Sequence, residues 1–139
     1  MTIIESIHNP RIKNISKLGK ARERKKQQRF VVEGYKEIRT ALAYGVNVQE
    51  VFYCPDLAKK DPSSLEIEKE KWLEVTSEVF SRISYRDSGD GFLAVADTFA
   101  YSPDDIEVKN NSTILVVETV EKPGNLGAII RTALATGVE

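Results

Sequence analysis

Segments that are typical of strands alternate with helical segments over the first hundred residues, and this alternation most constrains the fold. The run "RFVVEG" predicts a strand at 30–32, followed by a helix at 35–44. Further strands are predicted in "VNVQEVFYC", "WLEVT" and "GFLAVAD", and a short helix from Thr76 or Ser77 to Ile83 separates the last two. Alternating strands and helices indicate the α/β class.

The segments between these elements show no sign of a metal or redox site. Residues 55–70 are polar and predict a loop or an irregular helix. Asp87 and Asp90 lie in "RDSGDG", which lacks the ligand spacing and closing glutamate of a calcium loop, so we assign a turn and no metal. Cys54 is the single cysteine and follows an apolar run, so we expect it to be packed in the core.

Positive charge is concentrated at the start of the chain, although the net charge is only −1. Residues 1–39 hold eleven Lys and Arg against four Asp and Glu, or +7, so the other hundred residues carry −8. Asn9 and Pro10 predict the start of a helix through this stretch, and Gly19 can divide it in two. The segregated charge fits a contact with nucleic acid or acidic lipid, and it equally fits a solvated helix face.

The length of 139 residues suits one domain, or one domain and a piece of another. No apolar window approaches the roughly 18 residues that span a membrane, and the N-terminus lacks a signal-peptide pattern, so we expect a cytoplasmic protein. The polar composition after residue 97 is typical of a linker. We therefore expect a domain over 1–97, a linker over 98–112 and the start of a second domain over 113–139.

The run "TILVV" predicts a buried parallel strand leading into "ETVEKPGNLGAIIRTALATG". Pro123 and Gly124 suit a type II turn, Asn125 is a suitable N-cap, and a helix is predicted from Leu126 to about Thr136. Loops between strand ends and helix N-termini favour anionic ligands, because unpaired N–H groups and the helix dipole meet there. The segment 118–125 is therefore a candidate site.

Gly127 and Arg131 share one side of this predicted helix. Helical side chains lean toward the N-terminus, so Arg131 should pass over the bare backbone of Gly127 and approach Asn125. The alternative is that Asn125 only caps the helix while Arg131 pairs with an acidic surface neighbour.

The motif in "ETVEKPGNLGAIIRTALATG" resembles the first motif of the SpoU (TrmH-type) RNA ribose 2′-O-methyltransferases, in the SPOUT superfamily. Asn125, Gly127, Arg131 and Thr132 stand at the motif positions, and Lys122 departs from it where many members carry an acidic residue. The segments "NPRIKNISKL", "RFVVEGYKEIRTAL" and "GFLAVAD" are similar to the RNA substrate-binding domain of that family. The resemblance covers nearly the whole chain.

The resemblance implies a front domain that is a three-layer α/β/α sandwich like small ribosomal proteins, followed by the first strand and helix of a knotted SPOUT domain. It also implies methyl transfer from S-adenosylmethionine to a ribose of ribosomal or transfer RNA, by a homodimer. Arg131 would be the catalytic arginine and Asn125 would hold the substrate, with Glu118, Glu121 and Gly127 supporting the motif. Because a guanidinium is hardly ever deprotonated, we assign Arg131 to a phosphate or an incipient alkoxide rather than to a base.

The resemblance also assigns the basic N-terminal segment to RNA phosphates, which would supply affinity rather than sequence choice. The expected contacts are Lys17, Lys20, Arg22, Arg24, Lys25 and Lys26. In "F-x-x-E-G", Gly34 is interpreted as a requirement of the backbone and Glu33 as a carboxylate at a helix start.

The sequence ends at Glu139, before the second and third family motifs that form the knot and the cofactor pocket. We therefore expect about 100 further residues, a domain's length, in the whole enzyme, and an inactive, monomeric protein for this chain alone. The competing hypothesis is a non-catalytic RNA-binding module similar to a ribosomal protein. A nucleotide-triphosphate loop at "EKPGNLGA" is excluded because the required Lys-Ser/Thr pair is missing.

Overall fold

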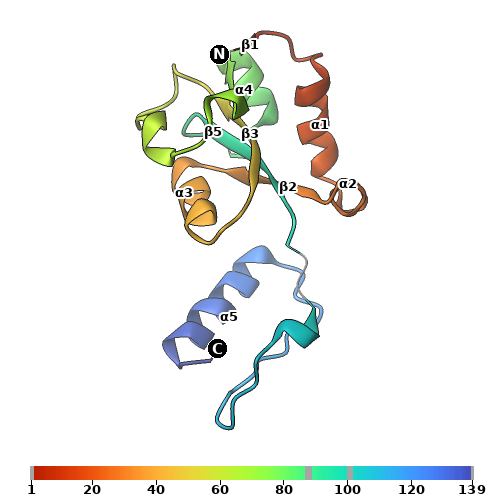
Figure 1. Ribbon diagram of the computed structural model, residues 1–139. Helices are drawn as coiled ribbons and strands as arrows, with labels where there is room; N and C mark the ends of the chain where they lie inside the picture. Colours follow the sequence, from red (N-terminus) through yellow and green to blue (C-terminus); the bar gives the residue numbers. More distant parts are fainter. Residues whose placement is uncertain (1, 87–88, 100–101, 139) are drawn as a thin grey trace. The chain divides into compact units, whose positions relative to one another are not determined.

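A computed structural model describes residues 2–86, 89–99 and 102–138 of the chain. Two compact units are present, Met1–Phe99 and Ala100–Glu139. The first contains a five-stranded mixed sheet in the order β1-β4-β3-β5-β2 (Figure 1). Its strands are β1 (Thr2–Ile4), β2 (Arg29–Glu33), β3 (Val48–Tyr53), β4 (Trp72–Val75) and β5 (Phe92–Asp97). Strands β1, β4 and β3 are parallel, whereas β5 is antiparallel to both β3 and β2. The predicted α/β class is confirmed.

Helices of the first unit begin and end where the local sequence predicts. They are α1 (Pro10–Leu18), α2 (Ala21–Gln27), α3 (Tyr35–Ala43) and α4 (Ser77–Ile83), with 3-10 turns at Pro62–Leu65 and Lys69–Lys71. The Asn9 side chain caps α1 by accepting from the N–H of Arg11, and Thr76 caps α4 by accepting from Val79. Gly19 separates α1 from α2, as its position predicted.

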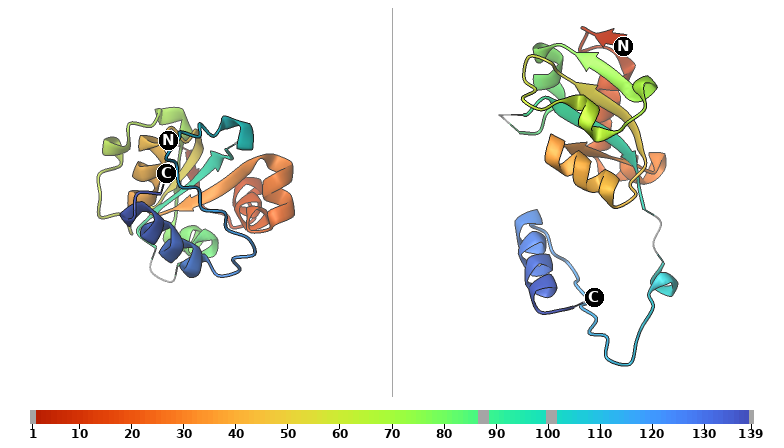
Figure 2. Two further views of the ribbon diagram at one scale, coloured as in Figure 1. Left: turned by 90° about the horizontal axis from the view of Figure 1, so that it is seen from below. Right: turned by 60° about the vertical axis from the view of Figure 1, so that its left-hand side comes forward.

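Helices cover both faces of the sheet, so the first unit is layered helix, sheet, helix (Figure 2). On one face, α1 and α4 pack on Phe52, Leu73, Leu93 and Val95. On the other, α3 packs through Ile38 on a cluster that includes Val51, Trp72, Phe92, Ala94 and Ala96. Successive residues of β5 alternate between the two clusters, which explains why this central strand is apolar throughout.

Two glycines in turns have backbone conformations that would be strained for any other residue. Gly34, between β2 and α3, has φ 109°, which confirms its interpretation as a backbone requirement. Gly91, just before β5, has φ 84°, and a Cβ there would lie 2.8 Å from both the Ala58 nitrogen and the Cys54 carbonyl oxygen. Cys54 itself is fully buried, as predicted.

The segment Thr113–Val117 is not the strand that its β-branched residues predicted. Residues 102–138 form no strand in the described structure, only a 3-10 turn at Pro103–Asp105 and helix α5 at Pro123–Ala135. Val116 remains 85% exposed. The reason is that a parallel strand needs a neighbour to pair its backbone, and the described part of this unit supplies none.

Helix α5 begins three residues earlier than predicted. Its N-cap is Lys122, so Pro123 and Gly124 lie in the first turn instead of a type II turn, and Asn125 is not the cap. Proline is favoured at this point because it has no N–H to leave unpaired and its φ already suits a helix. The predicted end is correct, since Gly137 follows the helix with φ 75°. None of the described helices combines the length and apolar character needed to cross a membrane.

Candidate functional site

Helix α5 carries the residues of the predicted catalytic motif. A Cβ built on Gly127 would lie 3.5 Å from Nη1 of Arg131, so the guanidinium lies over the bare glycine backbone, as predicted. This arrangement follows from their i,i+4 spacing and from the N-terminal lean of helical side chains. Arg131 is thereby directed along the helix toward the first turn.

Asn125 and Arg131 are both exposed and are not joined by a hydrogen bond. Among the described residues, neither side chain has a hydrogen-bond or ion-pair partner, so the alternative of a helix cap and an acidic surface partner is not observed either. Glu118 and Glu121 are also exposed, in the irregular segment before α5. Their supporting roles, and the catalytic roles of Asn125 and Arg131, stay predictions.

The motif of α5 is not surrounded by buried side chains of residues 102–138, so these residues do not enclose a cavity around it. Every described residue of this range whose exposure is known is exposed or half-buried. Apolar side chains of α5 are exposed to solvent: the exposed fraction is 41% for Leu126, 49% for Ile130 and 71% for Leu134. A cofactor with an adenosine and a methionine part requires a largely enclosed apolar pocket, and these residues do not fit that requirement by themselves.

Helices α1 and α2 follow one another along the chain (Figure 1) and carry all of the predicted RNA-contacting residues except Lys20, which lies between them. The exposed members of the set are Lys17, Lys20, Arg22, Lys25 and Lys26. None of these five forms an ion pair with a described residue. Their charges are therefore available to an external anion, because no carboxylate of the described protein neutralises them.

Arg24 differs from the other basic residues. Its Nη1 donates to the carbonyl oxygens of Leu18 at 3.0 Å and Gly19 at 2.8 Å, at the end of α1. These contacts satisfy helix-terminal carbonyls and place positive charge at the negative end of the helix dipole. Arg24 thus has a structural role, and any contact with RNA must use its remaining N–H groups.

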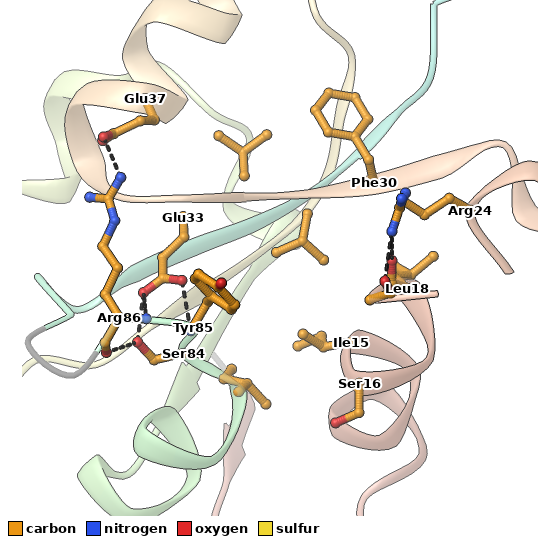
Figure 3. Close-up of a pocket in the computed structure, with 14 residues that line it drawn as sticks. Ile15, Ser16, Leu18, Arg24, Phe30, Glu33, Glu37, Ser84, Tyr85 and Arg86 are labelled. Carbon is orange, nitrogen blue, oxygen red and sulfur yellow. Dashed lines mark hydrogen bonds and ion pairs between the residues drawn. The ribbon is translucent and has the colours of Figure 1, made fainter. Parts of the chain in front are cut away.

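A pocket of about 720 Å³ lies between α1, β2 and the turn after α4 (Figure 3). Its apolar lining comes from Ile15, Leu18, Phe30, Val31, Val32 and Ile83. Arg24 and Arg86 lie toward opposite ends of the pocket, and Glu33, Glu37, Ser84 and Tyr85 complete one side. The sequence did not predict this pocket, because residues far apart in the chain form it.

Glu33 has a different role from the predicted carboxylate at the start of α3. It accepts hydrogen bonds from the Ser84 hydroxyl at 2.6 Å, the Tyr85 N–H at 2.8 Å and the Arg86 N–H at 3.3 Å. Asp90 instead accepts from the Tyr35 N–H at the start of α3, at 2.8 Å. Glu33 therefore ties β2 to the turn after α4.

Arg86 donates to Glu37 at 2.8 Å across the same side of the pocket. The hydrogen bond from Arg86 holds the pKa of the Glu37 carboxyl below its ordinary value, against a smaller opposing effect of burial. Asp87 lies outside the described residues. Within the described ranges, no cluster of three or more His, Cys, Asp and Glu side chains could hold a metal ion.

This fold and its charged helices are those of a known class of domain. The family model of the MRM3-like substrate binding domain matches residues 9–94, which include β2, β3, β4 and the first half of β5. The chain belongs to the SpoU/TrmH family of RNA 2′-O-methyltransferases, and it corresponds to their N-terminal, substrate-binding half. The resemblance stated from the motifs is thus confirmed.

Individual relatives agree with this assignment. The 23S rRNA (guanosine(2553)-2′-O)-methyltransferase RlmP of Bacillus subtilis is 29% identical over all of this chain and 53% of its own length. The crystal structure of an RNA 2′-O ribose methyltransferase matches 99% of the chain and 54% of its own, with 33% identity and a TM-score of 0.81. An AdoMet-bound rRNA methyltransferase from Sinorhizobium meliloti matches 99% and 52%, with 30% identity and a TM-score of 0.79. The chain spans about half the length of the curated relatives it matches.

Proposed function

We propose that this chain is the RNA-binding part of an S-adenosylmethionine-dependent 2′-O-ribose methyltransferase that acts on ribosomal RNA. The observation that carries the proposal is the row of exposed, unpaired cations on α1 and α2, within a domain whose relatives modify RNA. Phosphate neutralisation by such residues supplies most of the affinity for RNA and little sequence choice. The whole protein would be a cytoplasmic homodimer, and this chain alone a monomer.

The chemistry would need Arg131 and Asn125 together with parts of the whole protein outside this chain. A ribose hydroxyl is a poor nucleophile, so the enzyme must align it and stabilise the charge that develops on its oxygen. Arg131 would hold a phosphate or the incipient alkoxide, and Asn125 would position the substrate. As no described side chain of residues 102–138 is buried, these residues do not line an enclosed cavity, and we expect no methyl transfer by the 139-residue chain.

RNA binding is tested first with the double variant Lys25→Glu/Lys26→Glu. Each phosphate contact contributes about 0.7–0.9 to the slope of log K against log salt concentration. Loss of two contacts should therefore lower the magnitude of that slope by about 1.4–1.8 and weaken binding to ribosomal RNA fragments. The measurement is fluorescence anisotropy at several salt concentrations.

The matched control is Lys59→Glu/Lys60→Glu, which reverses the charge of another adjacent pair of exposed lysines in the loop after β3. Equal effects of the two double variants would indicate a general charge effect and would contradict an interface on α1 and α2. An unchanged salt dependence of binding in the Lys25→Glu/Lys26→Glu variant would also contradict an RNA interface on α1 and α2.

Methyl transfer is tested with the whole protein, this chain serving as the control. Radiolabel from S-adenosylmethionine should reach a ribose of unmodified ribosomal RNA only with the whole protein. Arg131→Ala should lower the rate by about 10²–10³, the loss typical for a group that stabilises a developing oxyanion, while Arg39→Ala on α3 should not. A base role for Arg131 would instead make the rate keep rising with pH into the strongly alkaline range, where a guanidinium begins to lose its proton.

RNA binding without any label would favour the second candidate, a non-catalytic RNA-binding module. The observation in its favour is that every buried hydrophobic residue of the described structure lies at or before Ala96, ahead of the motif of α5.

A further inference from the structure

Tyr85 is an exposed aromatic residue whose ring packs on no other aromatic ring of the described residues. Tyr35 and Tyr53 pack against Phe92, with ring centroids 5.3 and 5.2 Å apart. Tyr85, by contrast, is 96% exposed, although it lies at the rim of the pocket between α1 and β2. Large exposed aromatic side chains beside a pocket are typical of binding sites.

The side chain of Glu33, on β2, fixes the turn that carries Tyr85. This carboxylate accepts from the Tyr85 N–H, from the neighbouring Arg86 N–H and from the Ser84 hydroxyl (Figure 3). Fixing the backbone on both sides of the ring lowers the entropy that a ligand must remove when it binds. The exposed ring is thus held on a pre-organised support.

Charges and apolar surface around Tyr85 suit a nucleotide. A volume of about 720 Å³ lies within the range of small-ligand pockets, and its lining is mainly apolar. Toward the described residues, Arg86 donates only Nη2 to Glu37 and Arg24 only Nη1 to the end of α1, so each guanidinium has further N–H donors that these residues do not use. The carboxylates of Glu33 and Glu37 are both engaged with donors of the turn, which reduces their repulsion of a phosphate.

Arg24 also connects this pocket with the basic surface, since it belongs to the α2 segment that carries Lys25 and Lys26. An RNA strand on that surface therefore has a pocket beside its phosphate track. In an A-form helix the bases are stacked and paired, so only a bulge, a loop or an end can place a base in such a pocket.

We propose that the pocket between α1, β2 and the turn 84–86 receives an unpaired nucleotide of the RNA, whose base stacks on Tyr85 and whose phosphates lie near Arg24 and Arg86. This inference rests on the proposed function and adds the class of RNA to it. The basic helices bind any phosphate chain, whereas the Tyr85 pocket selects RNA with an unstacked base.

The test compares two RNA hairpins that differ only by one bulged nucleotide, with the 139-residue chain and fluorescence anisotropy. The wild type should bind the bulged hairpin about tenfold more tightly, the scale of one base stacked on an aromatic side chain. Tyr85→Ala should remove this preference without changing the salt slope or the melting temperature. Tyr85→Phe should keep it, because the ring remains. Tyr44→Ala should also keep the preference for the bulged hairpin. It removes another exposed tyrosine, which follows α3 and does not line this pocket.

Equal binding of both hairpins by the wild type, or an unchanged preference in Tyr85→Ala, overturns the inference. If the Lys25→Glu/Lys26→Glu variant still lowers the salt slope in that case, the proposed RNA-binding function stands and only the nucleotide pocket is wrong. Failure of the wild type to bind either hairpin contradicts the proposed function and this inference together.

Discussion

Residues 2–99 and residues 102–138 differ in how their sequence signals become structure. All buried hydrophobic residues found in the structure lie between Ile4 and Ala96, in two clusters on opposite faces of one sheet. The second unit has the denser family motif and a 13-residue helix, yet its described side chains form no buried core. A motif specifies which residues take part in chemistry, whereas burial decides whether they are held in place.

Amide hydrogen exchange should show the largest difference between the two units. Amides of β3 and β5 should open only with global unfolding, at about 5–15 kcal/mol for a domain of this size. Amides of α5 should exchange with little protection, because an unsupported helix of this length is marginal in water. Mass spectrometry of peptides from both units makes the measurement, and protection of α5 equal to that of β5 would contradict the comparison.

Truncation of a core side chain should distinguish the units next. Phe52 is completely buried, so Phe52→Ala should lower the free energy of unfolding by about 3–5 kcal/mol. Ile130 on α5 is 49% exposed, and Ile130→Ala should change the main urea transition by less than about 0.5 kcal/mol. A similar cost for both variants would mean that α5 belongs to the same cooperative unit.

Two glycines with similar backbone angles offer a finer comparison. Gly91→Ala combines a strained φ of 84° with close contacts to the backbone of Cys54 and Ala58, and should cost about 2–4 kcal/mol. Gly137 has φ 75°, and a Cβ there would meet no atom of the described residues within 4 Å, so Gly137→Ala should leave the main thermal transition unchanged. Differential scanning calorimetry measures the thermal transition of both variants. An unchanged transition in Gly91→Ala would contradict the close contacts of Gly91 with Cys54 and Ala58.

The Glu37–Arg86 pair should give the smallest effect, visible in acid. Arg86 lowers the folded-state pKa of Glu37 below its ordinary value of 4.5. The pair therefore stabilises the fold above that pH, and the contribution disappears as the pH falls through the lowered folded-state pKa. Both side chains are about half exposed, so solvent screening limits the effect to well under about 1 kcal/mol.

Urea midpoints at pH 7 and pH 3 test this pair. Glu37→Gln and Arg86→Ala should each reduce the loss of stability between the two pH values by the same amount. The double variant should show no further reduction, since either change already removes the pair. Additive effects of the two single changes in the double variant would contradict a stabilising Glu37–Arg86 pair.

The sequence was sufficient for the elements of the first unit that depend on local signals. The caps at Asn9 and Thr76 and the apolar run of β5 have local causes, and the structure agrees with each. At Thr113–Val117 the same kind of signal failed, because strand propensity has no effect without a strand to pair with. Helix α5 begins three residues before the predicted start because the first turn of a helix accommodates Pro123.

Features that join distant segments could not be predicted from one sequence. Glu33 contacts Ser84 and Tyr85, which are 51 and 52 residues away, and no local pattern marks that carboxylate as the support of a turn. Strand β1 has only three residues, too few for a periodic signal, and it is recognised only through its pairing with β4. Tyr85 and Arg86 are adjacent in the sequence, but their position beside the pocket follows only from the tertiary structure.

The order of the strands has a consequence for synthesis of the protein on the ribosome. Strand β2 forms the edge of the sheet and, among the described strands, pairs only with β5, from Arg29 with Asp97 to Glu33 with Leu93. Strand β2 therefore has no partner strand until β5, the last strand of this unit, has been translated. During that interval the cationic segment around α2 does not yet pack on a complete sheet. A nascent chain can therefore bind polyanions before its fold is complete. Slow, non-local closure of β2 onto β5 should be the step that ends this exposure.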